Sequence, residues 1–282
     1  MPRGAFRTTI GALAAAVALL ASGCSSQEAD IVRTALDKQI DSATVAVAFS
    51  MKMGGERIEM SLNGPYSSNG EKDLPTVDWR ARVVGVTAKP IRGRVITTAK
   101  NAFVEYEGVM YEAGEARIAQ LAQQQGGSDE ELGTADIKRM LNKAKRWFPT
   151  GDTQKSARLG GEAVTRVTGR LDLAAAWPDL MKMAGEQPGV PTVTAKQLEG
   201  LVSDPRFTLD VGKTDGAVRR IAVSLDVRKA AGGGKVRFGM RFKDVGKPVA
   251  ITPPATGTGR PLEELTPKLR ELLGTVAPAS VS

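Results

Sequence analysis

Few side chains of this 282-residue sequence are equipped for covalent chemistry, and the foremost is Cys24. It is the only cysteine, and the chain contains no histidine. Without histidine, Ser-His-Asp and Cys-His nucleophilic catalysis are excluded, as are zinc sites built on imidazole or on several thiolates. No disulfide can form within the chain. The role of the single thiol therefore has to be found in the residues around it.

The residues before Cys24 have the layout of a secretory signal peptide. Arg3 and Arg7 give a basic start without acids, and an apolar run over residues 10–20 leads to the small residues Ala21-Ser22-Gly23. The apolar run is too short for a comfortable bilayer span, which needs about 20 residues. We therefore expect export and removal of residues 1–23.

A cysteine directly after Ala-Ser-Gly resembles the lipobox of bacterial lipoproteins, with Ala21 at the position where that family favours leucine. The resemblance implies that Cys24 is thioether-linked to diacylglycerol and becomes the first residue of the mature chain. Two acyl chains suffice for stable anchoring. The expected location is the outer face of the cytoplasmic membrane, in the cell envelope. The alternatives are a cleaved signal with an incidental cysteine and an uncleaved anchor.

Composition limits the partners of the mature chain. Removal of residues 1–23 leaves 259 residues, enough for one large domain, and lowers the formal charge from +8 to about +6. We interpret this excess as an ordinary solvated surface, with attraction to an anionic membrane as the alternative. A nucleic-acid partner is not expected, because no basic run is interleaved with aromatic residues.

Other candidate motifs carry little chemistry. Gly212-Lys213-Thr214 resembles the end of a phosphate-binding P-loop, but Phe207 stands where the motif needs glycine, so we predict a turn. No carboxylate pair is singled out for hydrolysis, and aromatic residues make up only 5% of the chain. The sequence thus predicts no catalytic residue, no metal and no cofactor apart from the lipid on Cys24.

The elements are predicted from hydrophobic periodicity. Residues 24–30 are expected to form a short polar tether, capped by Asp30 at the start of a helix over 31–41. Alternating apolar residues predict strands at 45–53, 58–62, 76–86, 91–98, 101–106, 109–112, 162–171, 206–211, 217–227 and 235–245. Helices are predicted at 114–125, 134–146, 172–181 and 195–203. A single domain over 31–254 would precede a Pro/Gly-rich tail at 255–282 that carries a short Leu-rich helix.

This layout resembles the actinobacterial LprG/LppX lipoproteins and, more distantly, the lipoprotein carriers LolA and LolB. The resemblance lies in the cysteine motif, the order of elements, and the segments at 103–114, 160–172, 210–227 and 247–253. It implies an α+β fold of LolA/LppX type, in which a strongly curved antiparallel half-barrel of roughly 10–11 strands has helices covering its concave face around a cavity for acyl chains.

From this resemblance we expect a non-enzymatic lipoprotein that binds or carries a lipid or lipidated ligand. Methionines at several inward positions fit an adaptable cavity wall. A one-residue register error would replace the candidates of a whole strand. The candidates are Val47, Phe49, Met51, Met60, Trp79, Val83, Trp177, Leu180, Met181, Leu201, Phe238 and Met240. The alternative is an envelope interaction or assembly protein with a packed core and no ligand, which docks a protein partner.

Overall fold

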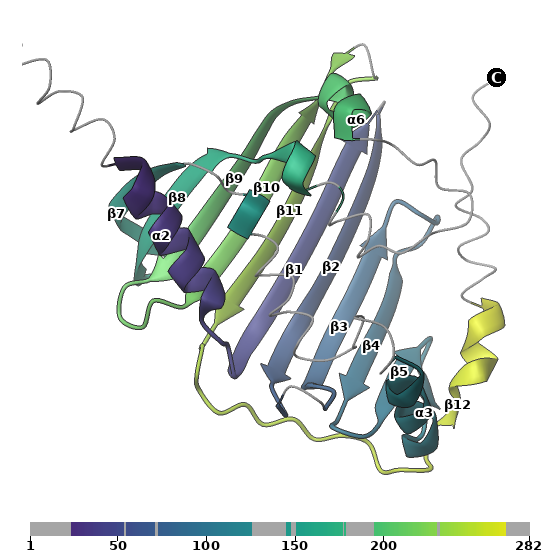
Figure 1. Cartoon of the computed structure of the whole chain (residues 1–282). Helices are drawn as coiled ribbons and strands as arrows, with labels where there is room; N and C mark the ends of the chain where they lie inside the picture. The colour runs from purple at the N-terminus through teal and green to yellow at the C-terminus, as the bar shows by residue number, and fades with distance from the viewer. Residues whose placement is uncertain are drawn as a thin grey trace, which may run out of the picture.

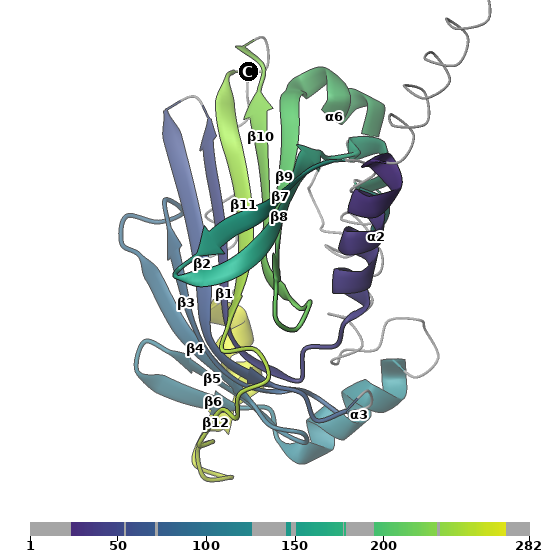
Figure 2. The same ribbon diagram turned by 90° about the vertical axis from the view of Figure 1, so that its left-hand side faces the viewer.

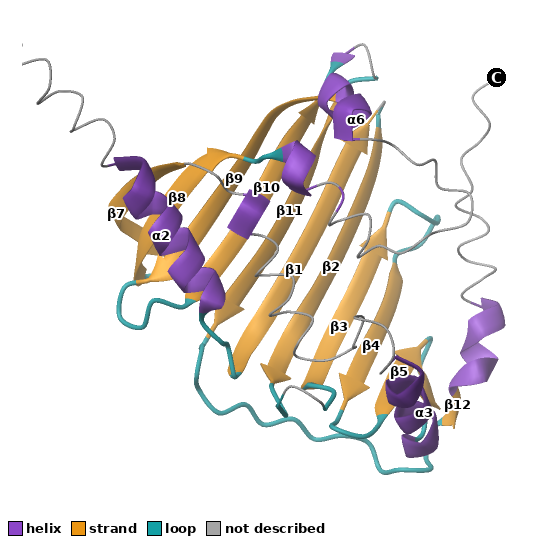
Figure 3. Ribbon diagram, in the orientation of Figure 1, coloured by secondary structure: helices purple, strands orange, loops and turns teal. Residues whose placement is uncertain are grey.

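The computed structural model describes residues 24–53, 55–70, 73–125, 145–147, 151–176, 178, 195–229 and 232–268. Twelve strands in these ranges belong to one open sheet (Figures 1 and 3). They are β1 (Ser42–Met53), β2 (Glu56–Ser67), β3 (Thr76–Val84), β4 (Ile91–Thr97), β5 (Ala102–Tyr106), β6 (Val109–Glu112), β7 (Gly151–Leu159), β8 (Glu162–Arg170), β9 (Val202–Gly212), β10 (Val218–Val227), β11 (Gly234–Lys243) and β12 (Arg260–Pro261).

The sheet is made from two runs of neighbouring strands that meet in the middle. Its order is β12-β6-β5-β4-β3-β2-β1-β11-β10-β9-β8-β7. All pairs are antiparallel except β12 with β6. The central pair joins β1 to β11, with Val47 opposite Met240 and Phe49 opposite Phe238. Strands far apart in the sequence are therefore neighbours, and the sheet remains open at β12 and β7.

The helices lie on one side of the sheet (Figures 1 and 2). They are α2 (Cys24–Asp37), α3 (Glu115–Gln125) and α6 (Ala195–Leu201), with short 3₁₀ turns η1 (Lys145–Trp147) and η3 (Leu262–Glu264). We call the sheet surface that faces α2 the inner face and the opposite surface the outer face. Within the described residues, no helix is both long and apolar enough to cross a bilayer.

The main core lies between α2 and the β8–β1 part of the inner face. Val32, Ala35 and Leu36 of α2 are buried, and they belong to one cluster with Leu209 and Phe242. Their spacing along α2 places them on one side of the helix, as the periodicity predicts. The helix thus contributes its apolar stripe to this end of the sheet.

The start of α2 differs from the prediction. The helix begins at Cys24, so residues 24–30 are its first turns and not an extended tether. Serine, glutamine, glutamate and alanine in this segment are compatible with a helix, and Asp30 lies 3.6 Å from Arg33 one turn later. Because a helix rises about 1.5 Å per residue, Cys24 is held closer to the sheet than an extended segment would require.

Two strands were not predicted, and both lie at edges. β7 has few apolar residues, with Ala157 buried, so the alternation that marks the other strands is weak there. β12 contains only two residues, and it brings the predicted tail back to the sheet. Leu265 is 2% exposed, and the amide of Gly257 donates to Glu112 at 2.8 Å. Residues 257–265 therefore protect the β6 edge and are not separate from the sheet.

The predicted helical cover of the concave face is not confirmed. α2 covers one end, but Met60 near the centre is 48% exposed. The predicted helix at 134–146 lies almost entirely outside the described residues. Of the predicted helix at 172–181, Leu173–Ala176 are helical, and the Asp172 carboxylate accepts from the amide of Ala175 at 3.0 Å. The segment that resembles a P-loop is a turn between β9 and β10, as expected.

Candidate functional site

Apolar side chains line up across the inner face of the central strands. In the antiparallel register, directly paired residues point to the same face. One row contains Phe49 in its middle, paired with Phe238 on one side and Met60 on the other. We call it the apolar row, and its members from β10 to β4 are Val223, Phe238, Phe49, Met60, Val83 and Ile91.

A second row runs beside the first, nearer to α2. Met240, Val47 and Leu62 are its central members. Burial increases in this direction, since Val45 is buried whereas Val47 and Phe49 are only partly buried. The surface therefore changes from packed core to accessible apolar face within a few residues of one strand.

Most predicted ligand residues come together on this face. This face carries Trp79, on the same side of β3 as Val83, together with the residues that the strand register aligns: Val47, Phe49, Met51, Met60, Val83, Phe238 and Met240. Leu201 is apart from them, at the end of α6, and is 42% exposed. Trp177, Leu180 and Met181 lie outside the described residues. Ligand binding by any of these side chains stays a prediction.

Trp79 has a polar atom without a partner. Its indole Nε1 is buried and has no hydrogen-bond acceptor among the described residues, although the ring packs against the core. A buried donor left unsatisfied costs about 1–3 kcal/mol. Close by, Gly64 has a φ of 153°, and a Cβ there would lie 1.9 Å from the carbonyl oxygen of Asp78. Glycine thus permits β2 to approach β3 beside the tryptophan.

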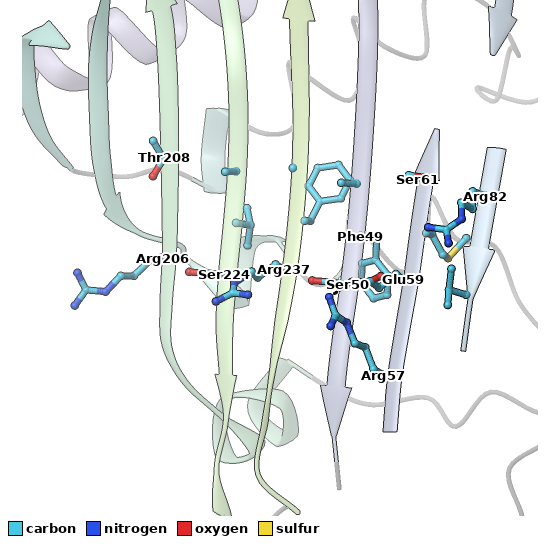
Figure 4. A pocket seen from close by; sticks show the side chains of 17 residues that line it. Phe49, Ser50, Arg57, Glu59, Ser61, Arg82, Arg206, Thr208, Ser224 and Arg237 are labelled. Carbon is cyan, nitrogen blue, oxygen red and sulfur yellow. Dashed lines mark hydrogen bonds and ion pairs between the residues drawn. The ribbon is translucent and has the colours of Figure 1, made fainter. Parts of the chain in front are cut away.

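The outer face carries mainly polar side chains between β9 and β3, and it is hollowed in two places. One open groove of about 640 Å³ crosses β9 to β3. Figure 4 shows Arg206, Arg237 and Arg57 spread across it, with Ser224 and Ser50 between them. Arg57 pairs with Glu59 and Arg206 pairs with Asp204. Arg237 has no ion pair with any described residue.

A second hollow, of about 820 Å³, adjoins the first and shares Ser61 and Arg82 with it. It lies on β3 and β4, between the β3–β4 loop and the β5–β6 turn, and we call it the arginine groove. Five cationic side chains and two acidic ones line it. These are Arg80, Arg82, Lys89, Arg92 and Arg94, with Glu105 and Glu107.

The arginines of this groove differ in whether a carboxylate lies close enough to offset their charge. Arg94 donates to both carboxylate oxygens of Asp78 at 2.6 Å and lies 3.9 Å from Glu105. The hydrogen bonds from Arg94 hold the pKa of Asp78 below its ordinary value, and the Asp78 carboxylate raises the pKa of Arg94. In the described part of the chain, Arg82 and Arg92 have no ion pair.

Near β7 the outer face carries an ionic cluster around Asp210. The Asp210 side chain is fully buried and accepts from Arg166 at 2.7 Å, while Arg220 lies 2.8 Å away. The hydrogen bond to Asp210 raises the pKa of Arg166. The carboxylate thereby bridges β8, β9 and β10. The buried Nε atoms of Arg220 and of Arg241, which lies directly opposite it on β11, have no hydrogen-bond partner among the described residues.

The arginine groove was missed by the sequence reasoning, which interpreted the excess charge as a solvated surface. A signal was present, since arginine occupies alternate positions at 80 and 82 and again at 92 and 94. In adjacent strands such positions share one face. Metal binding has no comparable basis, because no group of three or more acidic or thiol side chains in the described residues is placed to hold an ion.

Comparisons with known proteins give distant likenesses of fold. LprF from Mycobacterium bovis aligns with a TM-score of 0.48 and 16% identity, over 82% of this chain and 98% of that chain. A DUF1329 family protein from Desulfovibrio piger aligns with a TM-score of 0.23 and 12% identity, over 79% and 94% of the two chains. No protein-family model and no curated protein matches the sequence. The functional argument therefore proceeds from the chain's own residues.

Proposed function

We propose that this protein is an envelope lipoprotein, anchored through Cys24 to the outer face of the cytoplasmic membrane, that binds an acyl-chain ligand on its inner face. It acts as a carrier and performs no chemistry on the ligand. The observation that carries the proposal is the apolar row, in which Met60 is 48% exposed and Phe49 and Phe238 are only partly buried. Large accessible apolar patches on proteins mark interaction or ligand-binding sites.

The dimensions of the row suit an acyl chain. Six strands contribute to it, and strands are about 4.8 Å apart, so the row is roughly 24 Å long. One leaflet of a bilayer has a hydrocarbon depth of about 15 Å. A membrane acyl chain could therefore lie along the row for its whole length. Fully burying a phenylalanine or methionine side chain contributes about 1.5–3 kcal/mol.

Native mass spectrometry of the full-length protein tests the proposal. The protein is purified in neutral detergent, and copurifying lipid is extracted and identified. We expect a stoichiometric acyl-chain adduct in addition to the covalent lipid on Cys24. An adduct-free protein that also fails to take up cis-parinaric acid would overturn the proposal and favour the packed-core interaction protein.

A pair of variants locates the ligand. Met60 and Ser61 are neighbours on β2 and point to opposite faces, and both are exposed. Met60→Asp places a carboxylate in the apolar row and should weaken cis-parinaric acid binding at least tenfold, because the charge must be desolvated. Ser61→Asp adds the same charge to the outer face and should leave binding unchanged. Equal binding by both variants would place the ligand elsewhere.

A further inference from the structure

Two arginine pairs face each other across β3 and β4. Arg82 lies directly opposite Arg92, and Arg80 lies directly opposite Arg94. Like charges at directly paired positions of a sheet are destabilising. The arrangement occurs twice in succession in the arginine groove, and once more on the same face where Arg220 lies opposite Arg241.

Only part of this charge is neutralised within the protein. Asp78 and Glu105 act on Arg94, and Asp78 also attracts Arg80. Among the described residues, neither Arg82 nor Arg92 forms an ion pair, and both are exposed. The groove therefore contains a facing pair of guanidinium groups that are free to bind an anion.

The walls of the groove supply further donors. Lys89 and Thr87 come from the β3–β4 loop, and Asn63 and Ser61 come from β2. The groove thus offers the guanidinium groups of Arg82 and Arg92, one ammonium group and several neutral hydrogen-bond donors around one open space. Arginine forks match the oxygens of phosphate in bidentate geometry, and lysine adds a point charge.

We propose that the arginine groove binds a phosphoryl group, with Arg82 and Arg92 as its principal ligands. A phosphoryl group presents several oxygens, so two guanidinium groups can bind it together through charge-assisted hydrogen bonds. The groove opens on the outer face, and of the apolar row only Ile91 also borders it. Its principal ligands, Arg82 and Arg92, are not part of the proposed acyl-chain site.

Isothermal titration calorimetry of the full-length protein in neutral detergent provides the test. Inorganic pyrophosphate represents a soluble phosphoryl ligand. Dihexanoyl phosphatidylglycerol represents a lipid headgroup, with dihexanoyl phosphatidylcholine as the zwitterionic reference of equal chain length. The variant is R82Q/R92Q. Its control is R57Q/R206Q, which removes the same charge from exposed outer-face arginines that already have carboxylate partners.

We expect R82Q/R92Q to bind the phosphoryl probe at least about tenfold more weakly, since charge-assisted bonds are lost, and R57Q/R206Q to bind it like the parent protein. Binding of pyrophosphate identifies a soluble ligand. Binding of phosphatidylglycerol alone, in preference to phosphatidylcholine, identifies a headgroup. Binding of neither probe, or equal weakening by both variants, overturns the proposal. The midpoint temperature of thermal unfolding should be equal or higher for R82Q/R92Q than for the parent, because a like-charge pair is removed. Weaker binding by a variant that is equally stable cannot be due to misfolding.

Discussion

The two halves of the sheet use the same alternation of side chains to different effect. At the α2 end, the inner face is covered, and Leu36 is 1% exposed within the core. At the centre, the same alternation leaves Met60 about half exposed. Alternation therefore specifies which side chains share a face, but the presence of a covering helix decides whether that face is core or surface.

The outer face shows the same division. Towards β7, the buried carboxylate of Asp210 bridges Arg166 and Arg220. Over β3 and β4, Arg82 and Arg92 face each other without a carboxylate from the described residues. On the inner face, one end is covered by α2 and the centre is open; on the outer face, a carboxylate bridges arginines at one end but is absent between Arg82 and Arg92 in the described part of the chain. The uncovered and unbridged parts are where we propose that ligands bind.

The largest expected effect is on the covered end. Leu36→Ala should lower the free energy of unfolding by roughly 3–5 kcal/mol, because a fully buried side chain is removed and a cavity remains. Met60→Ala should change it by less than about 1 kcal/mol, because the side chain is already half solvated. Urea unfolding followed by circular dichroism measures both. Equal losses would show that the centre is also packed core.

A smaller loss is expected from the ionic cluster. Asp210→Asn leaves Arg166 and Arg220 without their carboxylate, which should cost about 3 kcal/mol, near the lower end for broken buried pairs because both arginines reach solvent. Glu59→Gln breaks the exposed pair with Arg57 and should cost no more than about 0.5 kcal/mol. Chemical denaturation of the two variants compares them. If Asp210→Asn leaves the free energy of unfolding unchanged, the buried carboxylate does not hold the strands together.

The smallest expected effect is on the pH dependence of stability, which distinguishes the arginine paired with Asp78 from the arginines without a carboxylate partner among the described residues. The pKa of Asp78 is lowered in the folded protein by the hydrogen bonds from Arg94. The stabilisation is therefore complete above the unfolded value of about 3.9 and is lost as pH falls through the lower folded value. Between pH 5 and pH 2, the parent should lose about 1 kcal/mol more stability than Asp78→Asn.

Thermal melts across this pH range provide the measurement. Arg94→Gln should remove the same acid-dependent contribution, since it eliminates the donor, while Arg92→Gln should preserve it. Parallel pH profiles for the parent and Asp78→Asn would show that the pair contributes nothing to folding.

Much of the sheet could be predicted because its strands are strongly patterned. Each predicted strand has a counterpart in the structure, and the placement of Val47, Phe49 and Met51 on one face follows from their spacing. β7 was missed because a polar edge strand lacks that pattern, and β12 because two residues carry none. The arginines at 80, 82, 92 and 94 were visible in the sequence, but only the pairing of β3 with β4 shows that they meet.

The sequence alone predicts an export signal before Cys24, excludes Ser-His-Asp and Cys-His catalysis, and indicates the apolar face of each strongly patterned strand. Those properties depend on residue type and local spacing. The tertiary structure decided that β1 pairs with β11, which joins Phe49 to Phe238 and makes one continuous apolar row. It also decided which part of that row α2 covers. Both outcomes depend on contacts between distant segments, which local periodicity does not encode.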